Sequence, residues 1–229
     1  MNRLLIATNN QGKIEELQDL LKDAGIELVT PAQIDLALDV IEDGLTYAEN
    51  AAKKALAFAQ ASNLISLADD SGLEVDALDG APGLYSARYG SVSGNKLSDA
   101  ERRKILIQNL QDKPRPWTAR FKATIAIAVP NHVTLSGASR HEGSLPKQAE
   151  TLQSSQNGSL RVTYTAGICE GEIIPEERGA GGFGYDPIFL LDGLGQTMAE
   201  LSMDEKNRLS HRARAVINAR EALQMLFTK

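Results

Sequence analysis

The alternation of short apolar runs with helix-like repeats in the first third of the chain constrains the fold more than any other feature. Apolar runs predict buried strands at residues 4–7, 26–29 and 64–68. Apolar residues at helical spacing predict helices at 14–23 and 46–59 between them. This β-α-β-α-β order is typical of an α/β sheet with helices on its faces.

Local signals set the ends of two of these elements. Thr46, with Glu49 three residues later, predicts a capping box at the start of the second helix. Ser71 and Gly72 predict a turn that ends the third strand directly after Asp70. We therefore expect Asp70 at the end of a short buried strand.

The remainder of the chain predicts fewer and longer elements. A segment rich in Gly, Pro and aromatic residues at 72–89 predicts an ordered loop. An amphipathic pattern predicts a helix at 97–110, and strands are predicted at 117–129 and 160–169. The last predicted element is one helix over 203–227, with many cations on its outer faces.

One polar segment interrupts this second half. Residues 139–159 are poor in apolar side chains, and they contain Asn157-Gly158, a hairpin signal. We expect a protruding hairpin excursion here. No internal repeat and no clear linker divides the sequence, so we expect a single domain over residues 1–229.

Composition places the chain among soluble globular proteins, with 42% hydrophobic and 24% charged residues. No stretch reaches the roughly 18 apolar residues of a membrane span, and the first apolar run is too short for a signal peptide. A single cysteine, Cys169, excludes an intramolecular disulfide and fits a reducing, cytoplasmic location. The net charge of -6 argues against a general nucleic-acid coat, but it leaves room for a small anionic ligand in a local basic pocket.

Two adjacent acids, Asp69 and Asp70, follow the third apolar run. Neighbouring carboxylates repel each other, so water, a cation or strong donors must offset the repulsion. Mg²⁺ suits such a pair because it favours one or two carboxylates together with substrate phosphates. A solvated turn is the alternative from the dipeptide alone, since Asp and Gly are common in turns.

A polar loop at residues 8–13 lies between the first predicted strand and helix. A helix N-terminus suits a phosphate, and the loop adds the Thr8 hydroxyl, the Asn10 amide and the Lys13 ammonium. The pattern of a Walker loop is missing, and an ordinary solvated loop is the alternative. Lys54 in the second helix either presents its ammonium to a ligand or is a surface lysine.

Two later stretches could hold the rest of a ligand. Four glycines within residues 179–187 indicate close backbone approach to a ligand or a tight chain reversal. Phe183 and Tyr185 either stack on a base or fill the core. In the last helix, Lys206 and residues 210–212 form a donor set for carbonyl and phosphate oxygens, or a solvated helix face.

One acidic centre with several cationic or Gly-rich loops is the set of groups that binding of a nucleoside triphosphate with Mg²⁺ requires. On these residues the sequence closely resembles the inosine triphosphate pyrophosphatase family, whose members act on non-canonical purine nucleotides. Six motifs carry the resemblance in the family's order across nearly the whole chain: residues 8–13; 42–50 with Lys54; 68–73; 80–89; 182–189; and 198–201 through Lys206 to 210–212.

The resemblance implies a fold, an activity and an assembly. The fold would have a long central mixed sheet flanked by helices, and two lobes with an active-site cleft between them. The activity would be Mg²⁺-dependent hydrolysis of ITP, dITP or XTP to the nucleoside monophosphate and pyrophosphate, which cleanses the nucleotide pool. The assembly would be a homodimer without nucleic-acid or membrane partners.

Residue roles follow by the same resemblance. Asp70 would accept the proton and ligate the metal, Glu42 would help to hold Mg²⁺, and Asp69 would lie nearby. The implied substrate-binding residues are Thr8, Asn9, Asn10, Gln11, Gly12, Lys13 and Lys54 for the phosphates, Ser71 for a further contact, Phe183, Gly184, Tyr185 and Asp186 for the base and sugar, and Lys206, His211 and Arg212 to complete the site.

Two rival functions stay open at this point. One is a non-catalytic nucleotide sensor that uses the same loops, although carboxylates facing a triphosphate would bring pure binding little advantage. The other is a metal-dependent phosphatase that releases orthophosphate from a different metabolite. The identity of the product separates the rival enzymes.

Overall fold

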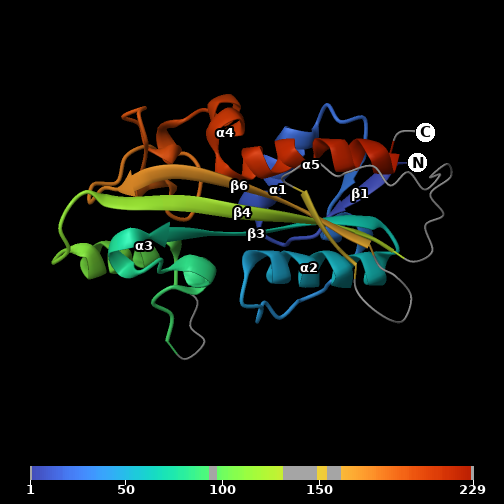
Figure 1. The fold of residues 1–229 in the computed structure, drawn as a ribbon, viewed down its shortest axis with the longest axis horizontal. Helices are drawn as coiled ribbons and strands as arrows, with labels where there is room; N and C mark the ends of the chain where they lie inside the picture. Colours follow the sequence, from blue (N-terminus) through green and yellow to red (C-terminus); the bar gives the residue numbers. More distant parts are fainter. Residues whose placement is uncertain (1, 93–96, 131–148, 154–160, 228–229) are drawn as a thin grey trace. The chain divides into compact units, whose positions relative to one another are not determined.

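The computed structural model describes residues 2–92, 97–130, 149–153 and 161–227. Its strands are β1 (Arg3–Ile6), β2 (Glu27–Val29), β3 (Ile65–Val75), β4 (Trp117–Val129), β5 (Ala149–Gln153), β6 (Arg161–Ile173) and β7 (Phe189–Leu191). Its α-helices are α1 (Gln11–Leu21), α2 (Tyr47–Ser62), α3 (Asp99–Leu110), α4 (Met203–Leu209) and α5 (His211–Phe227). Figure 1 shows these elements along the chain.

The strands form one mixed sheet in the order β2-β1-β3-β4-β6-β5, with β7 paired to β6. Strand β1 runs parallel to both β2 and β3, with Leu4 opposite Ile65. Strands β5 and β7 run antiparallel to β6. The predicted α/β class with a mixed sheet flanked by helices is therefore confirmed.

The chain divides into two compact units. The first unit comprises Met1–Asp70, Thr124–Gly167 and Arg214–Lys229, and the second comprises Ser71–Ala123 and Ile168–Ala213. The chain passes from one unit to the other within β3, β4, β6 and α5.

The core of the first unit is built from small side chains on α2. Ala51, Ala55 and Ala59 recur every four residues and are fully buried, so one face of the helix approaches the strands closely. They share this core with Phe58 and with Leu5 of β1. Figure 1 shows α2 on one side of the strands, with α1 and α5 on the other side.

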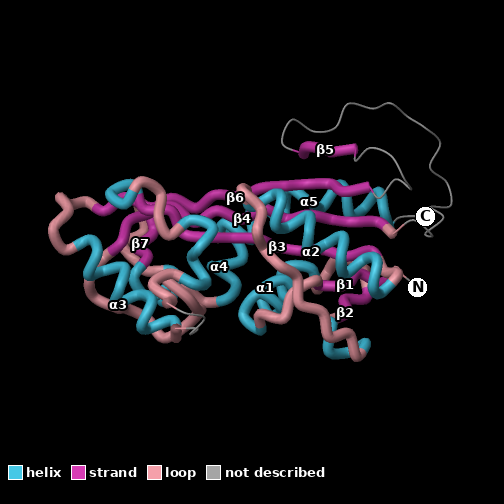
Figure 2. Tube along the Cα trace, turned by 90° about the horizontal axis from the view of Figure 1, so that it is seen from below, coloured by secondary structure: helices cyan, strands magenta, loops and turns pink. Residues whose placement is uncertain are grey.

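The core of the second unit uses larger side chains. Leu106 and Leu110 of α3 are fully buried in a cluster with Trp117, Phe121 and Phe189. The rings of Phe121 and Phe189 lie 4.6 Å apart between centroids, in a tilted arrangement. Figure 2 shows α3, β7 and α4 of this unit.

Strand β3 does not end at the predicted turn. It continues through Ser71 and Gly72 to Val75, because Leu73 and Val75 are fully buried in the core of the second unit. Asp70 therefore lies within a strand, not at its end.

The predicted last helix is two helices. Ser210 has an extended backbone (φ -67°, ψ 156°), which stops α4 at Leu209. Its hydroxyl accepts a hydrogen bond from the Ala213 N–H at 3.1 Å, so Ser210 caps the next helix. His211 and Arg212 consequently occupy the first turn of α5.

The predicted capping box of α2 is formed only in half. Thr46 Oγ1 accepts from the Glu49 N–H at 3.1 Å, as expected. The Glu49 carboxylate instead accepts from the N–H of Leu45, one residue earlier than the cap, at 2.6 Å. The helix still begins where the sequence predicts.

The expected excursion at 139–159 lies mainly outside the described residues, including its Asn-Gly turn. The described part is β5, which pairs antiparallel with β6 from Ala149 opposite Thr165 to Gln153 opposite Arg161. In the described part of the chain, no helix is both long enough and apolar enough to cross a membrane.

Candidate active site

Carboxylates and ammonium groups from four segments of the first unit converge near the middle of β3. The strand supplies Asp69 and Asp70, α1 supplies Lys13, α2 supplies Lys54, and the segment before α2 supplies Glu42. The Asp69 side chain is fully buried, and those of Asp70 and Lys54 are about one-tenth exposed. We call these five residues the acid–lysine cluster.

Lys54 contacts all three acidic residues of the acid–lysine cluster. Its Nζ lies 3.0 Å from Glu42 Oε2, 3.3 Å from Asp70 Oδ1 and 2.9 Å from the carbonyl oxygen of Asp69. An ammonium group has three donors, and these contacts occupy all three. Helix α2 thus aims one buried cation at both carboxylates predicted to hold the metal.

Lys13 makes a second cation contact with the same strand. Its Nζ lies 2.9 Å from Asp69 Oδ2 and 3.3 Å from the Asp69 carbonyl oxygen. Asp69 therefore faces Lys13, whereas Asp70 faces Lys54. The two neighbouring acids alternate in direction, as successive side chains in a strand must.

The two acids that face Lys54 differ in their titration. Burial raises the pKa of Asp70 to about 6, with the Glu42 charge adding to the rise and Lys54 and Lys13 opposing it. Burial is the largest single effect on Glu42 and acts to raise its pKa, but the charge and hydrogen bond of Lys54, the hydrogen bond with Asp70 and the charge of Lys13 together outweigh it, so this pKa is lowered. Burial acts against the Lys54 ammonium, yet Asp70, Glu42 and Asp69 raise its pKa overall. Of these two acids, Asp70 has its pKa raised toward neutrality and Glu42 has its pKa lowered.

The other predicted residues of the 8–13 loop mostly hold the loop itself. The Asn10 side chain caps α1 by accepting from the Lys13 N–H at 3.1 Å. Thr8 Oγ1 accepts from the Asn10 N–H at 3.2 Å, and Asn9 donates to the Leu38 carbonyl at 3.3 Å. Gln11 donates to Glu15 one turn along α1. Together with Gly12, these residues shape the N-terminus of α1.

The acid–lysine cluster fits a divalent cation. Its three carboxylates and two ammonium groups leave one net negative charge when all are ionised, and carboxylate oxygens are ligands that Mg²⁺ prefers. Glu42 and Asp70 converge on the same ammonium, so both point to one region. In the described part of the chain, no group of three or more His, Cys, Asp or Glu side chains could hold a metal. Two carboxylates plus substrate oxygens remain a suitable set for Mg²⁺.

The second unit holds a separate buried ion pair. Asp186 Oδ2 accepts from Lys206 Nζ at 2.7 Å and from the Phe183 N–H at 3.0 Å. Both charged side chains are about 6% exposed. A Cβ on Gly182 (φ +71°) would overlap the Asp186 carboxylate, so the glycine is required for this close approach.

The half-buried ring of Phe183 faces two cations. Lys206 Nζ lies 5.3 Å from the ring centroid, and the Arg212 guanidinium carbon lies 5.7 Å from it. Arg212 is buried and donates to Ser71 Oγ at 3.1 Å. His211 is also buried, with its ring stacked on Phe121 at 4.7 Å. The structure thus brings Ser71, Phe183, Lys206 and Arg212 close together.

Tyr185 is held inside the second unit. Its side chain is buried, and its hydroxyl donates to the Ser86 carbonyl at 2.9 Å. Burial raises the pKa of this phenol. Its observed contacts are those of a core residue that anchors the loop, the alternative that the sequence left open.

Two residues that contact this loop were missed by sequence reasoning. Asp99 and Arg103 of α3 bind the main chain of Gly184, which is more than 80 residues away in sequence. The capping box of Ser98 and Glu101 marks the start of α3, but no local pattern reports what its side chains reach.

Comparison with known proteins gives one consistent family. A sequence model described as the Ham1 family matches residues 4–222. The chain is 42% identical over 226 residues to a dITP/XTP pyrophosphatase of Desulforamulus reducens, covering 98% of this chain and 97% of the relative. It is 39% identical over 217 residues to a dITP/XTP pyrophosphatase of Listeria monocytogenes, covering 94% and 92%.

Solved structures agree with the sequence comparison. A HAM1 protein from Coxiella burnetii superposes with a TM-score of 0.76 at 33% identity, covering 98% of this chain and 99% of that one. The Staphylococcus aureus Ham1 protein superposes with a TM-score of 0.72 at 33% identity, covering 97% and 98%. The chain therefore belongs to the Ham1 family.

Proposed function

We propose that this protein hydrolyses non-canonical purine nucleoside triphosphates, dITP, XTP and ITP, to the monophosphate and pyrophosphate with Mg²⁺. The observation that carries the proposal is the acid–lysine cluster, in which Asp70 with a pKa near 6 lies beside Lys54 and Glu42. Its setting in a Ham1-family chain, whose relatives are named dITP/XTP pyrophosphatases, supports the substrate class.

The lysines of the cluster would attract the phosphates through their positive charge. A triphosphate resists attack by water because of its own negative charge, and Lys13 and Lys54 would stabilise charge that develops on the departing pyrophosphate. The N-terminus of α1, capped by Asn10, adds main-chain N–H groups and a partial positive charge. Glu42 and Asp70 would hold Mg²⁺, whose charge offsets that of the phosphates.

Asp70 would take the proton from the attacking water. A general base works best when its pKa lies near the working pH, and Asp70 meets that condition because it is buried and lies beside Glu42. Asp69 is paired with Lys13 and would position that lysine. The proton-transfer role is therefore assigned to Asp70 alone.

The second unit would recognise the nucleoside. Phe183 offers a ring face for stacking, and Arg212 and Lys206 lie over that ring as donors for a 6-keto oxygen. Adenine carries a 6-amino group in that place, which cannot accept these bonds. A buried donor left unpaired costs about 1–3 kcal/mol, roughly tenfold to hundredfold in discrimination.

Assembly and location are part of the same proposal. The family resemblance supports a homodimer, which light scattering of the purified chain would test. Cys169 is buried and, as the single cysteine of the sequence, forms no intramolecular disulfide, which fits the reducing cytoplasm.

A substrate panel tests the proposed function. Purified protein is given dITP, XTP, ITP, GTP or ATP with Mg²⁺, and pyrophosphate and orthophosphate are assayed separately. We expect pyrophosphate from the first three and little from ATP. Orthophosphate as the initial product would favour the phosphatase, and nucleotide binding without turnover would favour the sensor.

A further inference from the structure

The Gly-rich loop of the second unit is held by α3 through the main chain of one glycine, Gly184. Asp99 Oδ2 accepts from the Gly184 N–H at 2.6 Å, and Arg103 Nη1 donates to the Gly184 carbonyl at 2.8 Å. Both main-chain polar groups of a single glycine are therefore bound by side chains of one helix. Both bonds involve a charged partner, which makes them stronger than neutral hydrogen bonds.

The two anchoring side chains are themselves held. Arg103 forms a two-bond ion pair with Glu177, with Nε to Oε1 and Nη2 to Oε2 both at 2.8 Å. Asp99 pairs with Arg102 one turn along α3. The Arg103 side chain is 11% exposed, so its guanidinium is fixed between Glu177 and the loop.

The anchored glycine needs such support. Gly184 has φ +62°, a conformation that residues with a side chain rarely adopt, and a Cβ there would meet nothing within 4 Å. Glycine has the widest conformational freedom of any residue. Its neighbour Phe183 carries the ring that lies near Lys206 and Arg212. The Gly184 N–H belongs to the peptide group that joins Gly184 to Phe183, so a shift of that group would displace Phe183 on the side that Asp186 does not hold.

We infer that Asp99 and Arg103 are positioning residues that hold the main chain on both sides of Gly184 and thereby fix Phe183 for base recognition. The part concerning base recognition rests on the proposed function. Neither residue needs to touch the substrate, since each acts through the loop. The inference predicts a loss in substrate binding that depends on the Phe183 ring.

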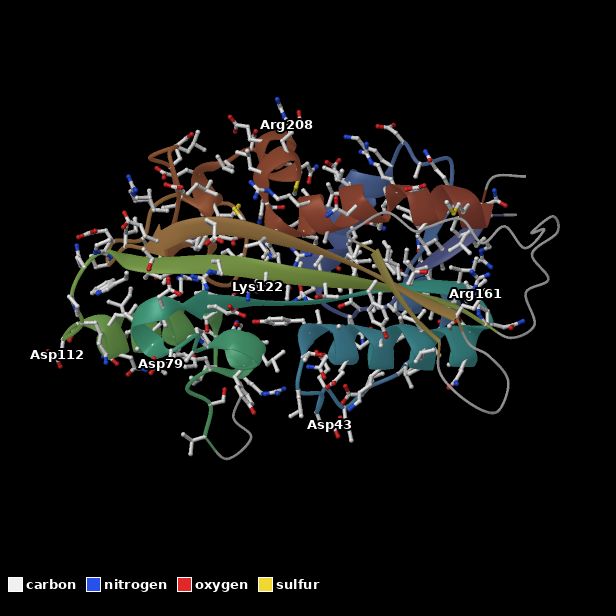
Figure 3. The ribbon with its side chains drawn as sticks, viewed as in Figure 1. Asp43, Asp79, Asp112, Lys122, Arg161 and Arg208 are labelled. Atoms are coloured by element: carbon white, nitrogen blue, oxygen red, sulfur yellow. The ribbon has the colours of Figure 1, made fainter. Side chains whose placement is uncertain are left out.

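Kinetics of matched variants test the inference. Arg103→Met keeps the aliphatic part of the side chain but removes every hydrogen-bond donor. Arg208→Met is the control, because Arg208 is exposed on α4 and donates a hydrogen bond to the Asp204 carbonyl of its own helix (Figure 3). We expect Arg103→Met to raise KM for dITP about tenfold, as for loss of a charge-assisted hydrogen bond, with less change in kcat. Arg208→Met should match the wild type.

The same change made in a Phe183→Ala background separates positioning from general damage. There, Arg103→Met should alter KM by less than about twofold, because the group that it positions is already gone. An equal loss in both backgrounds, or no change in KM in either, would overturn the inference. If Arg103→Met does not fold, Glu177→Ala at the surface should raise KM in the same direction by less.

Hydrogen exchange gives a readout that does not depend on turnover. Amide exchange in peptides covering residues 179–186 should be faster in Arg103→Met than in the wild type and unchanged in Arg208→Met. Equal protection in all three proteins would show that Arg103 does not hold the loop. If the wild type releases no pyrophosphate from dITP, the proposed function fails, and exchange still decides whether α3 anchors the loop.

Discussion

At the scale of single residues, the proposed role of Asp70 as a base and its burial have opposing effects on its ionisation. Ionisation makes it a base, but burial disfavours the charge and raises its pKa to about 6 from 3.8. The folded protein therefore keeps a proton on Asp70 over a pH range in which the unfolded chain has lost it. Stability from this group is full below about pH 4 and declines as the pH rises through 6.

Asp70→Asn should therefore gain stability relative to the wild type as the pH rises. We expect the difference in the free energy of unfolding, variant minus wild type, to grow by about 1 kcal/mol between pH 5 and pH 8. Urea denaturation of both proteins with a chelator present measures it. A difference that stays constant or shrinks with pH would mean that the Asp70 pKa is not raised.

In the second unit, Asp186 and Lys206 form a buried ion pair. Removal of one partner from a buried ion pair leaves an uncompensated charge, which costs about 3–5 kcal/mol. Lys206→Met should therefore destabilise the protein strongly in urea denaturation. The double variant Lys206→Met with Asp186→Asn should regain part of the loss, and an additive loss would contradict the pairing.

At the scale of secondary-structure elements, the Gly-rich loop makes a matched test possible. Gly182 and Gly193 have nearly equal φ values of +71° and +69°, but a Cβ overlaps Asp186 only at Gly182. Gly193→Ala should cost about 1–2 kcal/mol from backbone strain and leave kcat/KM unchanged. Gly182→Ala should also lower kcat/KM for dITP, because it displaces the partner of Lys206. Equal kinetics in the two variants would contradict this role.

Elements with local signals could be predicted from the sequence. Strand β4 has the predicted bounds, and α2 begins after Thr46 because its cap is a local interaction. The full length of β3 could not be predicted, since Leu73 and Val75 extend it through burial in the core of the second unit. The break at Ser210 was also missed, because a serine inside a helical pattern does not reveal by itself that it caps a new helix.

The residues of the candidate site could also be predicted from the sequence, but their contacts could not. Residue types and motif order pointed to Lys13, Lys54, Glu42 and Asp70, and the structure brings these four together. Hydrogen-bond partners could not be predicted, because they depend on tertiary contacts. The clearest case is the hydrogen bond from Arg103 to the carbonyl of Gly184, which lies 81 residues later in the sequence.

At the scale of the whole molecule, the proposed chemistry depends on a divalent ion. A chelator should abolish pyrophosphate release, and added Mg²⁺ should restore it and raise the melting temperature, because a ligand of the folded state stabilises it. Glu42→Gln should weaken the Mg²⁺-dependent rise. Its neighbour Asp43, which is exposed and paired with Lys53, supplies the control Asp43→Asn (Figure 3). Equal Mg²⁺ responses in the two variants would argue against Glu42 as a ligand.

The most direct measurement compares wild type and Asp70→Asn with dITP and Mg²⁺ in one pyrophosphate assay. The wild type should release one pyrophosphate for each dITP consumed and no orthophosphate. Asp70→Asn should remain folded and lose about 10²–10⁴-fold in turnover, as expected when a general base is removed. Near-wild-type pyrophosphate release by Asp70→Asn, or orthophosphate from the wild type, would contradict the account.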